Sequence, residues 1–218
     1  MAKNIFFTSD LHFCHDKGFL YEPRGFTCIQ DMNEVLVENW NKVVKPEDEV
    51  YNLGDFALND IDAAIPYINR LNGTIRWILG NHDTEKKIDK IIDNCPNVWH
   101  YGWAYCFKHD KKYSIYMSHY PTLTANFDEK KFSQHVIALH GHTHQQKNWI
   151  YPDNPFTYHV GVDSHNCTPV HIDEVLTDIR QRWNNIGMLP TPTKPADIYP
   201  HLYMSDSPLK IVFEGDMN

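Results

Sequence analysis

Short hydrophobic runs alternate with amphipathic stretches along the first half of the chain. Residues 5–8, 50–53 and 75–79 form short, mostly hydrophobic runs, which is the pattern of buried strands. Between these runs, hydrophobic residues recur at helical spacing within residues 31–44 and 61–71. This order predicts a largely parallel sheet that is covered by helices.

The second half of the chain has a different pattern. Residues 103–107 and 113–117 flank a short polar segment, which predicts a hairpin. Residues 136–139 and 158–162 are further strand candidates, and a helix is expected over about 172–183. We therefore expect an α/β protein with a two-sheet β-sandwich flanked by helices and with its loops gathered along one edge.

The pattern changes again after residue 186. Several prolines lie within residues 187–218 and prevent a long helix there: Pro190, Pro192, Pro195, Pro200 and Pro208. Residues 209–213 are hydrophobic enough to form a strand. We expect residues 1–186 to form one catalytic domain. Residues 187–218 are expected to be a proline-rich extension, packed on the body or on a partner subunit of a homo-oligomer.

Composition narrows the class of protein. With 218 residues and 42% hydrophobic content, the chain can bury the core of one ordinary domain. No run approaches the ~18 apolar residues of a membrane span, and we see no signal-peptide core, so we expect a cytoplasmic protein without a membrane partner. The five cysteines are scattered, which favours reduced thiols. The formal charge of −8 argues against a nucleic-acid partner.

Polar residues follow the hydrophobic runs at five places. These places are Asp10-x-His12, Gly54-Asp55, Gly80-Asn81-His82-Asp83, Ser118-His119 and Gly141-His142-Thr143-His144. Carboxylate oxygen, amide oxygen and neutral imidazole are the ligands that hard and borderline dications prefer. Because such strand ends converge, we expect a site for two divalent metals, in which one carboxylate can bridge ions ~3.5–4 Å apart.

This ordered set of motifs resembles the calcineurin-like metallophosphoesterase superfamily, whose pattern is D-x-H, G-D, G-N-H-[DE], H and G-H-x-H. The resemblance spans residues 3 to about 183. In finer detail the motifs are similar to those of small single-domain bacterial and bacteriophage members. The resemblance implies a four-layer α/β/β/α fold and a metal-dependent phosphoric ester hydrolase.

The resemblance also implies a role for each motif residue. One metal would be bound by Asp10, His12, Asp55 and His144, and the other by Asp55, Asn81, His119 and His142. Manganese is the preferred ion, with iron, zinc, nickel and cobalt as alternatives. His82 would be the catalytic residue that is not a ligand. It would stabilise the charge on the phosphorus or protonate the leaving alkoxide during in-line attack by a metal-bridging hydroxide.

A sequence signature that this chain lacks narrows the class of substrate. Gly54-Asp55 is not extended into the Asp-Arg signature of phosphoprotein phosphatases. We therefore expect a small phosphodiester or phosphomonoester substrate, such as a nucleotide, a cyclic nucleotide or a glycerophosphodiester, and phosphodiesterase ahead of phosphatase activity. The alternatives are a nuclease acting on nucleic-acid ends and a non-catalytic, metal-bound interaction scaffold. Lys86, Lys87 and Lys90 are interpreted as a solvated helix face.

Three residues next to the motifs are candidate substrate contacts. His15 follows the first metal motif, in a loop expected to overhang the site. Tyr120 follows His119 and can stack on a base or sugar, although core packing is an equal alternative. His165 lies in a polar loop after the last predicted strand, together with Asp163.

Overall fold

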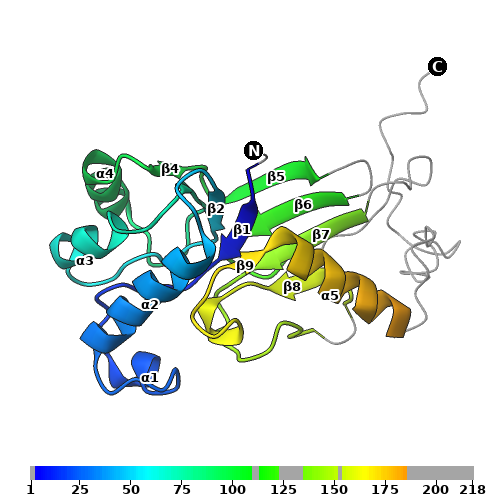
Figure 1. Cartoon of the computed structure of the whole chain (residues 1–218), viewed down its shortest axis with the longest axis horizontal. Helices are drawn as coiled ribbons and strands as arrows, with labels where there is room; N and C mark the ends of the chain where they lie inside the picture. The colour runs from blue at the N-terminus through cyan, green and yellow to red at the C-terminus, as the bar shows by residue number, and fades with distance from the viewer. Residues whose placement is uncertain (1–2, 110–112, 123–134, 152–153, 186–218) are drawn as a thin grey trace, which may run out of the picture.

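Two mixed β-sheets with flanking helices make up the described part of the protein (Figure 1). The computed structural model describes residues 3–109, 113–122, 135–151 and 154–185. The predicted extension over residues 187–218 lies outside this part. The α/β sandwich expected from the sequence is confirmed.

The first sheet has the strand order β4-β3-β2-β1-β9. Its strands are β1 Ile5–Thr8, β2 Glu49–Asn52, β3 Thr74–Trp77, β4 Val98–His100 and β9 Val170–His171. Strands β1 to β4 are parallel, and β9 runs antiparallel to β1. The loops that follow β1, β2 and β3 therefore leave the sheet at one edge.

The second sheet has the order β5-β6-β7-β8. Its strands are β5 Ala104–His109, β6 Tyr113–Ser118, β7 His135–His140 and β8 Thr157–His159. Strands β5 and β6 form the predicted antiparallel hairpin, whereas β6, β7 and β8 are parallel. A bridge between Ser9 and Gly161 joins the loop after β1 to the loop after β8, so the ends of both sheets meet.

Successive side chains of the first sheet point to opposite faces, and each face packs into a different hydrophobic core. On one face, Phe6, Val50 and Ile75 pack against helices that include the fully buried Trp40. These helices are α2 Ile29–Val43, α3 Ile61–Ile68 and α4 Glu85–Asn94, which lie together on one side in Figure 1. On the other face, Phe7 packs into a second core with residues of β6, β7 and α5 Ile172–Asn185.

Several element boundaries differ from the predicted ones. The strand expected over 158–162 already ends at His159, because the chain turns into a short 3-10 helix at Val162–Ser164. Helix α3 ends at Ile68 rather than at residue 71. The short elements α1 Gly18–Tyr21, β4 and β9 were not predicted.

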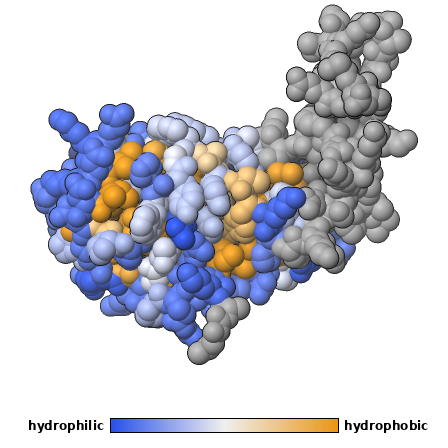
Figure 2. Space-filling model, turned by 90° about the horizontal axis from the view of Figure 1, so that it is seen from above, coloured by the Kyte–Doolittle hydropathy of each residue, from blue (hydrophilic) through white to orange (hydrophobic). Residues whose placement is uncertain are grey.

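The surface of the described part carries both hydrophilic and hydrophobic residues. Seen from above, hydrophilic residues cover much of the molecule and hydrophobic residues gather in separate patches (Figure 2). The largest exposed hydrophobic side chains are Phe19, Trp99, Trp103, Tyr120 and Tyr151. In the described residues, no helix is long and apolar enough to cross a membrane.

Candidate metal centre

The predicted metal ligands lie in loops with an unusual backbone. Asp10, His12, Asp55, His142 and His144 all have a φ between 49° and 70°, in the left-handed region that side-chain-bearing residues rarely adopt. Such strained residues persist only where the surrounding structure holds them, and they cluster at functional sites. The backbone conformation alone therefore indicates that these loops are candidates for a functional site.

Glycines allow close approach in two pairs of loops, the Gly80 loop with the Asp55 loop and the Gly141 loop with the Asp10 loop. A Cβ at Gly80 would collide with the carboxylate and backbone nitrogen of Asp55. A Cβ at Gly141 would collide with Ser9 and with the carboxylate of Asp10. The glycines of the predicted G-N-H-D and G-H-x-H motifs are thus required for close packing of the loops.

Atoms that can bind a metal lie close together on the His144 side of the cluster. His144 Nδ1 lies 3.1 Å from Asp163 Oδ2, and because a carboxylate can only accept, Nδ1 carries the proton. In the neutral ring, Nε2 then presents a lone pair, 3.2 Å from His12 Nε2 and 3.7 Å from Asp10 Oδ1. A cation placed among these atoms would satisfy all three.

Such atoms also lie close together on the His119 side. His119 Nδ1 donates to the carbonyl oxygen of Leu53 at 2.8 Å, which leaves Nε2 as an acceptor. This Nε2 faces Asn81 Oδ1 at 2.9 Å and His142 Nδ1 at 3.2 Å. Two acceptors, His119 Nε2 and Asn81 Oδ1, thus point at each other without a proton between them.

Asp55 lies between the two sides. Its Oδ2 is 3.5 Å from His12 Nε2 and also 3.5 Å from His119 Nε2. Its Oδ1 accepts the backbone N–H of His82 at 3.0 Å. This position fits the predicted bridging role.

The chemistry of this donor set fits divalent cations. Two groups of residues have ligand atoms within 4.8 Å of one another: Asp10, His12 and His144, and Asp10, Asp55 and His119. Asp10 and Asp55 are buried, and within the described residues neither has a lysine or arginine at ion-pair distance. Burial raises the pKa of Asp10 above its ordinary value. Such uncompensated carboxylates are costly unless a cation accompanies them.

A buried Arg24–Asp163 pair supports His144 and was not predicted as such. Arg24 donates from Nε to Asp163 Oδ1 at 2.8 Å and from Nη2 to Asp163 Oδ2 at 2.9 Å. Nη2 also donates to the backbone oxygen of Asp10 at 2.8 Å. Burial would raise the pKa of Asp163, but His144 and Arg24 hold it well below its ordinary value. The pair thus remains ionised and orients His144.

Asp83 holds two of the loops together. Its Oδ2 accepts from Gly80 N at 2.7 Å, Asp55 N at 2.9 Å and Trp77 Nε1 at 3.1 Å. Burial, together with the nearby charge of Asp55, raises the pKa of Asp83 to about 6 despite these hydrogen bonds. The sequence placed Asp83 in a motif but assigned it no role, because its donors are backbone groups and a tryptophan.

His82 occupies the open side of the cluster. Its side chain is half-exposed, and its Nε2 lies 3.9 Å from Asp55 Oδ2. Its ring packs edge-on against His12 at 5.6 Å and lies 6.3 Å from His15. The predicted catalytic residue and the predicted contact His15 are thus neighbours beside the cluster.

The other two predicted substrate contacts have different surroundings. Tyr120 is 47% exposed, and its ring meets the edges of His142 at 4.7 Å and His119 at 5.4 Å. His165 Nε2 lies 3.0 Å from the carbonyl oxygen of His159, so that nitrogen is already engaged within its own loop. A substrate role for either residue stays a prediction.

Comparisons with known proteins agree with the motifs and the fold. The family profile of the calcineurin-like phosphoesterase superfamily domain matches residues 4–153. An uncharacterised protein of Methanocaldococcus jannaschii is 32% identical over 179 residues, which are 80% of this chain and 90% of that protein. The gene 66 protein of Mycobacterium phage D29 is 29% identical over 198 residues, which are 82% of this chain and 98% of that protein.

A solved structure shows the same fold. A protein of unknown function from Aquifex aeolicus aligns with a TM-score of 0.61 and 23% identity, over 81% of this chain and 99% of that chain. The chain belongs to the calcineurin-like phosphoesterase superfamily, whose members are typically metal-dependent phosphoesterases. The family recognised from the motifs is thereby confirmed.

Proposed function

We propose that this protein is a dinuclear-metal-dependent phosphoesterase that hydrolyses a small phosphodiester or phosphomonoester, with diesters preferred. The observation that supports this most directly is the convergence of metal-binding atoms in two groups, Asp10, His12 and His144, and Asp10, Asp55 and His119, whose ligand atoms lie within 4.8 Å of one another. Asp10, His12, Asp55 and His144 would bind one ion, and Asp55, Asn81, His119 and His142 the other. Oxygen and imidazole ligands bind several divalent ions, among them manganese, iron, zinc, nickel and cobalt, and manganese is the ion that we propose first.

The ions, when bound, would supply Lewis acidity and activate the attacking water. A residue of the chain would meet the remaining requirement of the reaction, which is a proton for the leaving oxygen. Hydrolysis forms a bond from the water oxygen to phosphorus and breaks the bond from phosphorus to the leaving oxygen, which then needs a proton. His82 is half-exposed beside Asp55 and can donate that proton from its ring. The hydrogen bond from His82 N to Asp55 Oδ1 fixes the distance between the acid and the cluster.

Hydrolysis of bis-p-nitrophenyl phosphate in the presence of Mn²⁺ tests the proposal. We expect turnover by the full chain. A loss of about 10²-fold in His82→Ala is expected for a diester with an alkoxide leaving group, which needs a general acid, and a smaller loss for bis-p-nitrophenyl phosphate, because p-nitrophenolate is stable without a proton. His109→Ala is the matched control, because His109 lies at the end of the β5–β6 hairpin opposite to Ser118 and His119. Metal binding without turnover of any diester or monoester would instead favour a non-catalytic scaffold.

A further inference from the structure

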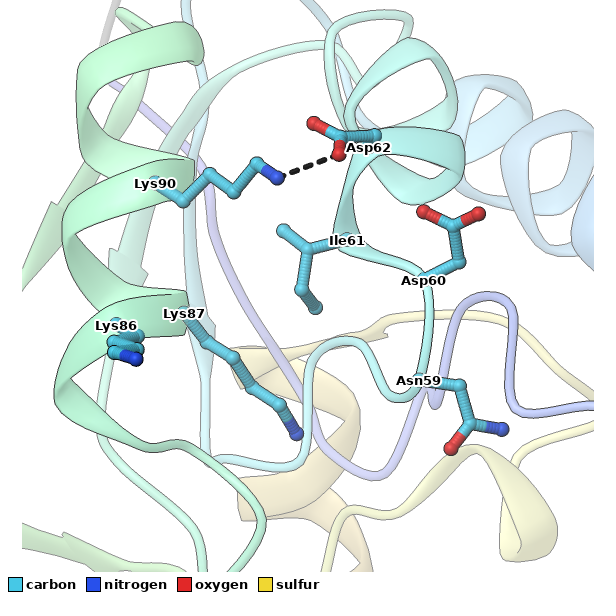
Figure 3. A pocket seen from close by; sticks show the side chains of 7 residues that line it. All are labelled: Asn59, Asp60, Ile61, Asp62, Lys86, Lys87 and Lys90. Carbon is cyan, nitrogen blue, oxygen red and sulfur yellow. Dashed lines mark hydrogen bonds and ion pairs between the residues drawn. The ribbon is translucent and has the colours of Figure 1, made fainter.

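A cleft of about 640 Å³ lies between the beginnings of α3 and α4. Figure 3 shows its lining, with lysines from α4 on one side and the segment from Asn59 to Asp62 on the other. The lysines are Lys86, Lys87 and Lys90, which the sequence alone suggested were a solvated helix face. The structure leaves these lysines accessible to solvent and places them along an open cleft.

The charges in the cleft are not balanced. Lys90 Nζ forms an ion pair with Asp62 Oδ2 at 2.6 Å, drawn as a dashed line in Figure 3. Asp60 caps α3 by accepting the N–H of Ala63 at 3.1 Å. Lys86 is exposed, and neither it nor Lys87 has a carboxylate at ion-pair distance among the described residues. Three lysines and two aspartates line the cleft, so the lining has a net charge of +1 and favours an anion.

The cleft adjoins the proposed proton donor. Lys87 Nζ donates to the carbonyl oxygen of His82 at 2.7 Å. The wall of the cleft thus begins at the backbone of the residue that would protonate the leaving group.

The opposite side of α4 has the opposite charge. A second cleft, of about 710 Å³, is lined by Asn81, Glu85, Asp89 and Trp103, among others. Its acidic side chains would repel an anionic group, whereas the lysine side would attract one. Helix α4 therefore divides the surroundings of the Gly80–Asp83 loop into an acidic and a basic side.

We propose that the cleft between α3 and α4 binds a second phosphate group, carried by the leaving group of the substrate, through Lys86 and Lys87. This inference rests on the proposed function, because it uses His82 to define the leaving-group side. Lysine binds phosphate as a point charge without fixed geometry, which suits the far end of a flexible substrate. The preferred substrates would accordingly be phosphoesters with two phosphates rather than one.

A pair of non-hydrolysable ligands tests the inference. Butylphosphonate and butane-1,4-bisphosphonate differ only in the second anionic group, and their P–C bonds resist hydrolysis. Calorimetric titration of each into the Mn²⁺-loaded full chain gives the ratio of their affinities. We expect the bisphosphonate to bind about tenfold more tightly, the scale of one or two charge-assisted contacts at a partly exposed site.

Variants of α4 assign the difference to the cleft. Lys86→Ala should reduce the ratio to about threefold or less, since exposed ionic contacts contribute modestly and add together. Lys87→Ala should also reduce it, whereas Glu85→Ala, on the acidic side of α4, should leave it unchanged. Equal binding of the two ligands by the unmodified chain, or an unchanged ratio in Lys86→Ala, would overturn the inference.

The calorimetric result does not depend on turnover. If the full chain failed to hydrolyse bis-p-nitrophenyl phosphate yet bound the bisphosphonate more tightly through Lys86, the proposed function would fail and the anion site would stand. Turnover of bis-p-nitrophenyl phosphate with no preference for the bisphosphonate would have the opposite meaning. The two failures are therefore distinguishable.

Discussion

Two buried aspartates flank the same strand and have opposite surroundings. Asp48 precedes β2 and accepts from Asn4 N at 3.1 Å, Asn4 Nδ2 at 2.9 Å and Lys45 N at 2.9 Å. Asp55 follows β2, and its Oδ2 faces the unprotonated ring nitrogen of His119. The carboxylate at one end of the strand is matched by donors, whereas the one at the other end shares its space with further acceptors. We therefore propose that one end of the strand serves stability and the other serves function.

Replacement of Asp55 tests the functional end and should have the largest effect. Asp55→Asn keeps the shape of the side chain and an oxygen that can accept from His82 N, but it removes the charge shared by both proposed metal positions. We expect the rate of Mn²⁺-dependent hydrolysis to fall by about 10³-fold, equivalent to several kcal/mol of lost transition-state stabilisation. Steady-state kinetics with bis-p-nitrophenyl phosphate measure the loss.

The same variant should have the opposite effect on the metal-free fold. Burial, and to a smaller extent the charge of Asp55, raises the pKa of Asp10. Removal of that charge relieves repulsion in the absence of metal, so Asp55→Asn should be more stable by about 1 kcal/mol in EDTA. Urea unfolding of both proteins gives this difference. A variant that was less stable than the unmodified chain would show that Asp55 serves the fold as Asp48 does.

The support behind His144 gives the next largest effect. Asp163→Asn removes the carboxylate that accepts from His144 Nδ1 and pairs with Arg24. The ring then loses its fixed orientation, and affinity for one Mn²⁺ should fall by about 10–100-fold. Calorimetric titration with Mn²⁺ measures this loss. Asp173→Asn is the control, because Asp173 is an exposed aspartate beside another histidine, His171.

The fold and the site were predictable from the sequence to different extents. The hydrophobic runs and the spacing of α2 and α5 sufficed for two sheets with helices, because these elements are long enough to show their period. Strand β9 was missed, since two residues carry no period and its pairing partner β1 lies more than 160 residues away. Local patterns do not report such long-range pairs.

The same distinction applies within the site. The side chains that converge in the structure were found because each stands in a recognisable local motif at a strand end. Arg24 was missed because its partner Asp163 is 139 residues away and neither segment contains a sequence motif that indicates the ion pair. His165 was named as a substrate contact from its position in a polar loop, yet its ring nitrogen contacts the carbonyl of His159. The direction in which a loop side chain points depends on tertiary packing.

The structural end of β2 should respond to substitution in stability alone. In Asp48→Asn, the amide group would face an N–H of Asn4 or Lys45, so at least one donor would lose its acceptor. We expect a loss of about 2 kcal/mol in the free energy of unfolding, with kcat for bis-p-nitrophenyl phosphate unchanged. Chemical denaturation and steady-state kinetics on the same preparation check both. A large fall in kcat would show that Asp48 also contributes to activity, so Asp48 and Asp55 would not differ in role as we propose.

The smallest expected effect is the pH dependence of the stability lost in Asp48→Asn. It tests the contrast between Asp48 and Asp55. Burial works to raise the pKa of Asp48, but the N–H groups of Lys45 and Asn4 outweigh it and hold the pKa below its ordinary value. Because the pKa is lower in the folded state than in the unfolded state, the ionised carboxylate contributes stability above about pH 4. This contribution disappears as the pH falls through the folded-state pKa. The difference in unfolding free energy between the unmodified chain and Asp48→Asn, measured in EDTA, should therefore be constant near neutral pH and shrink below about pH 4. A difference that grew in acid would mean that Asp48 is buried as the neutral acid, and its N–H donors would then not explain its burial.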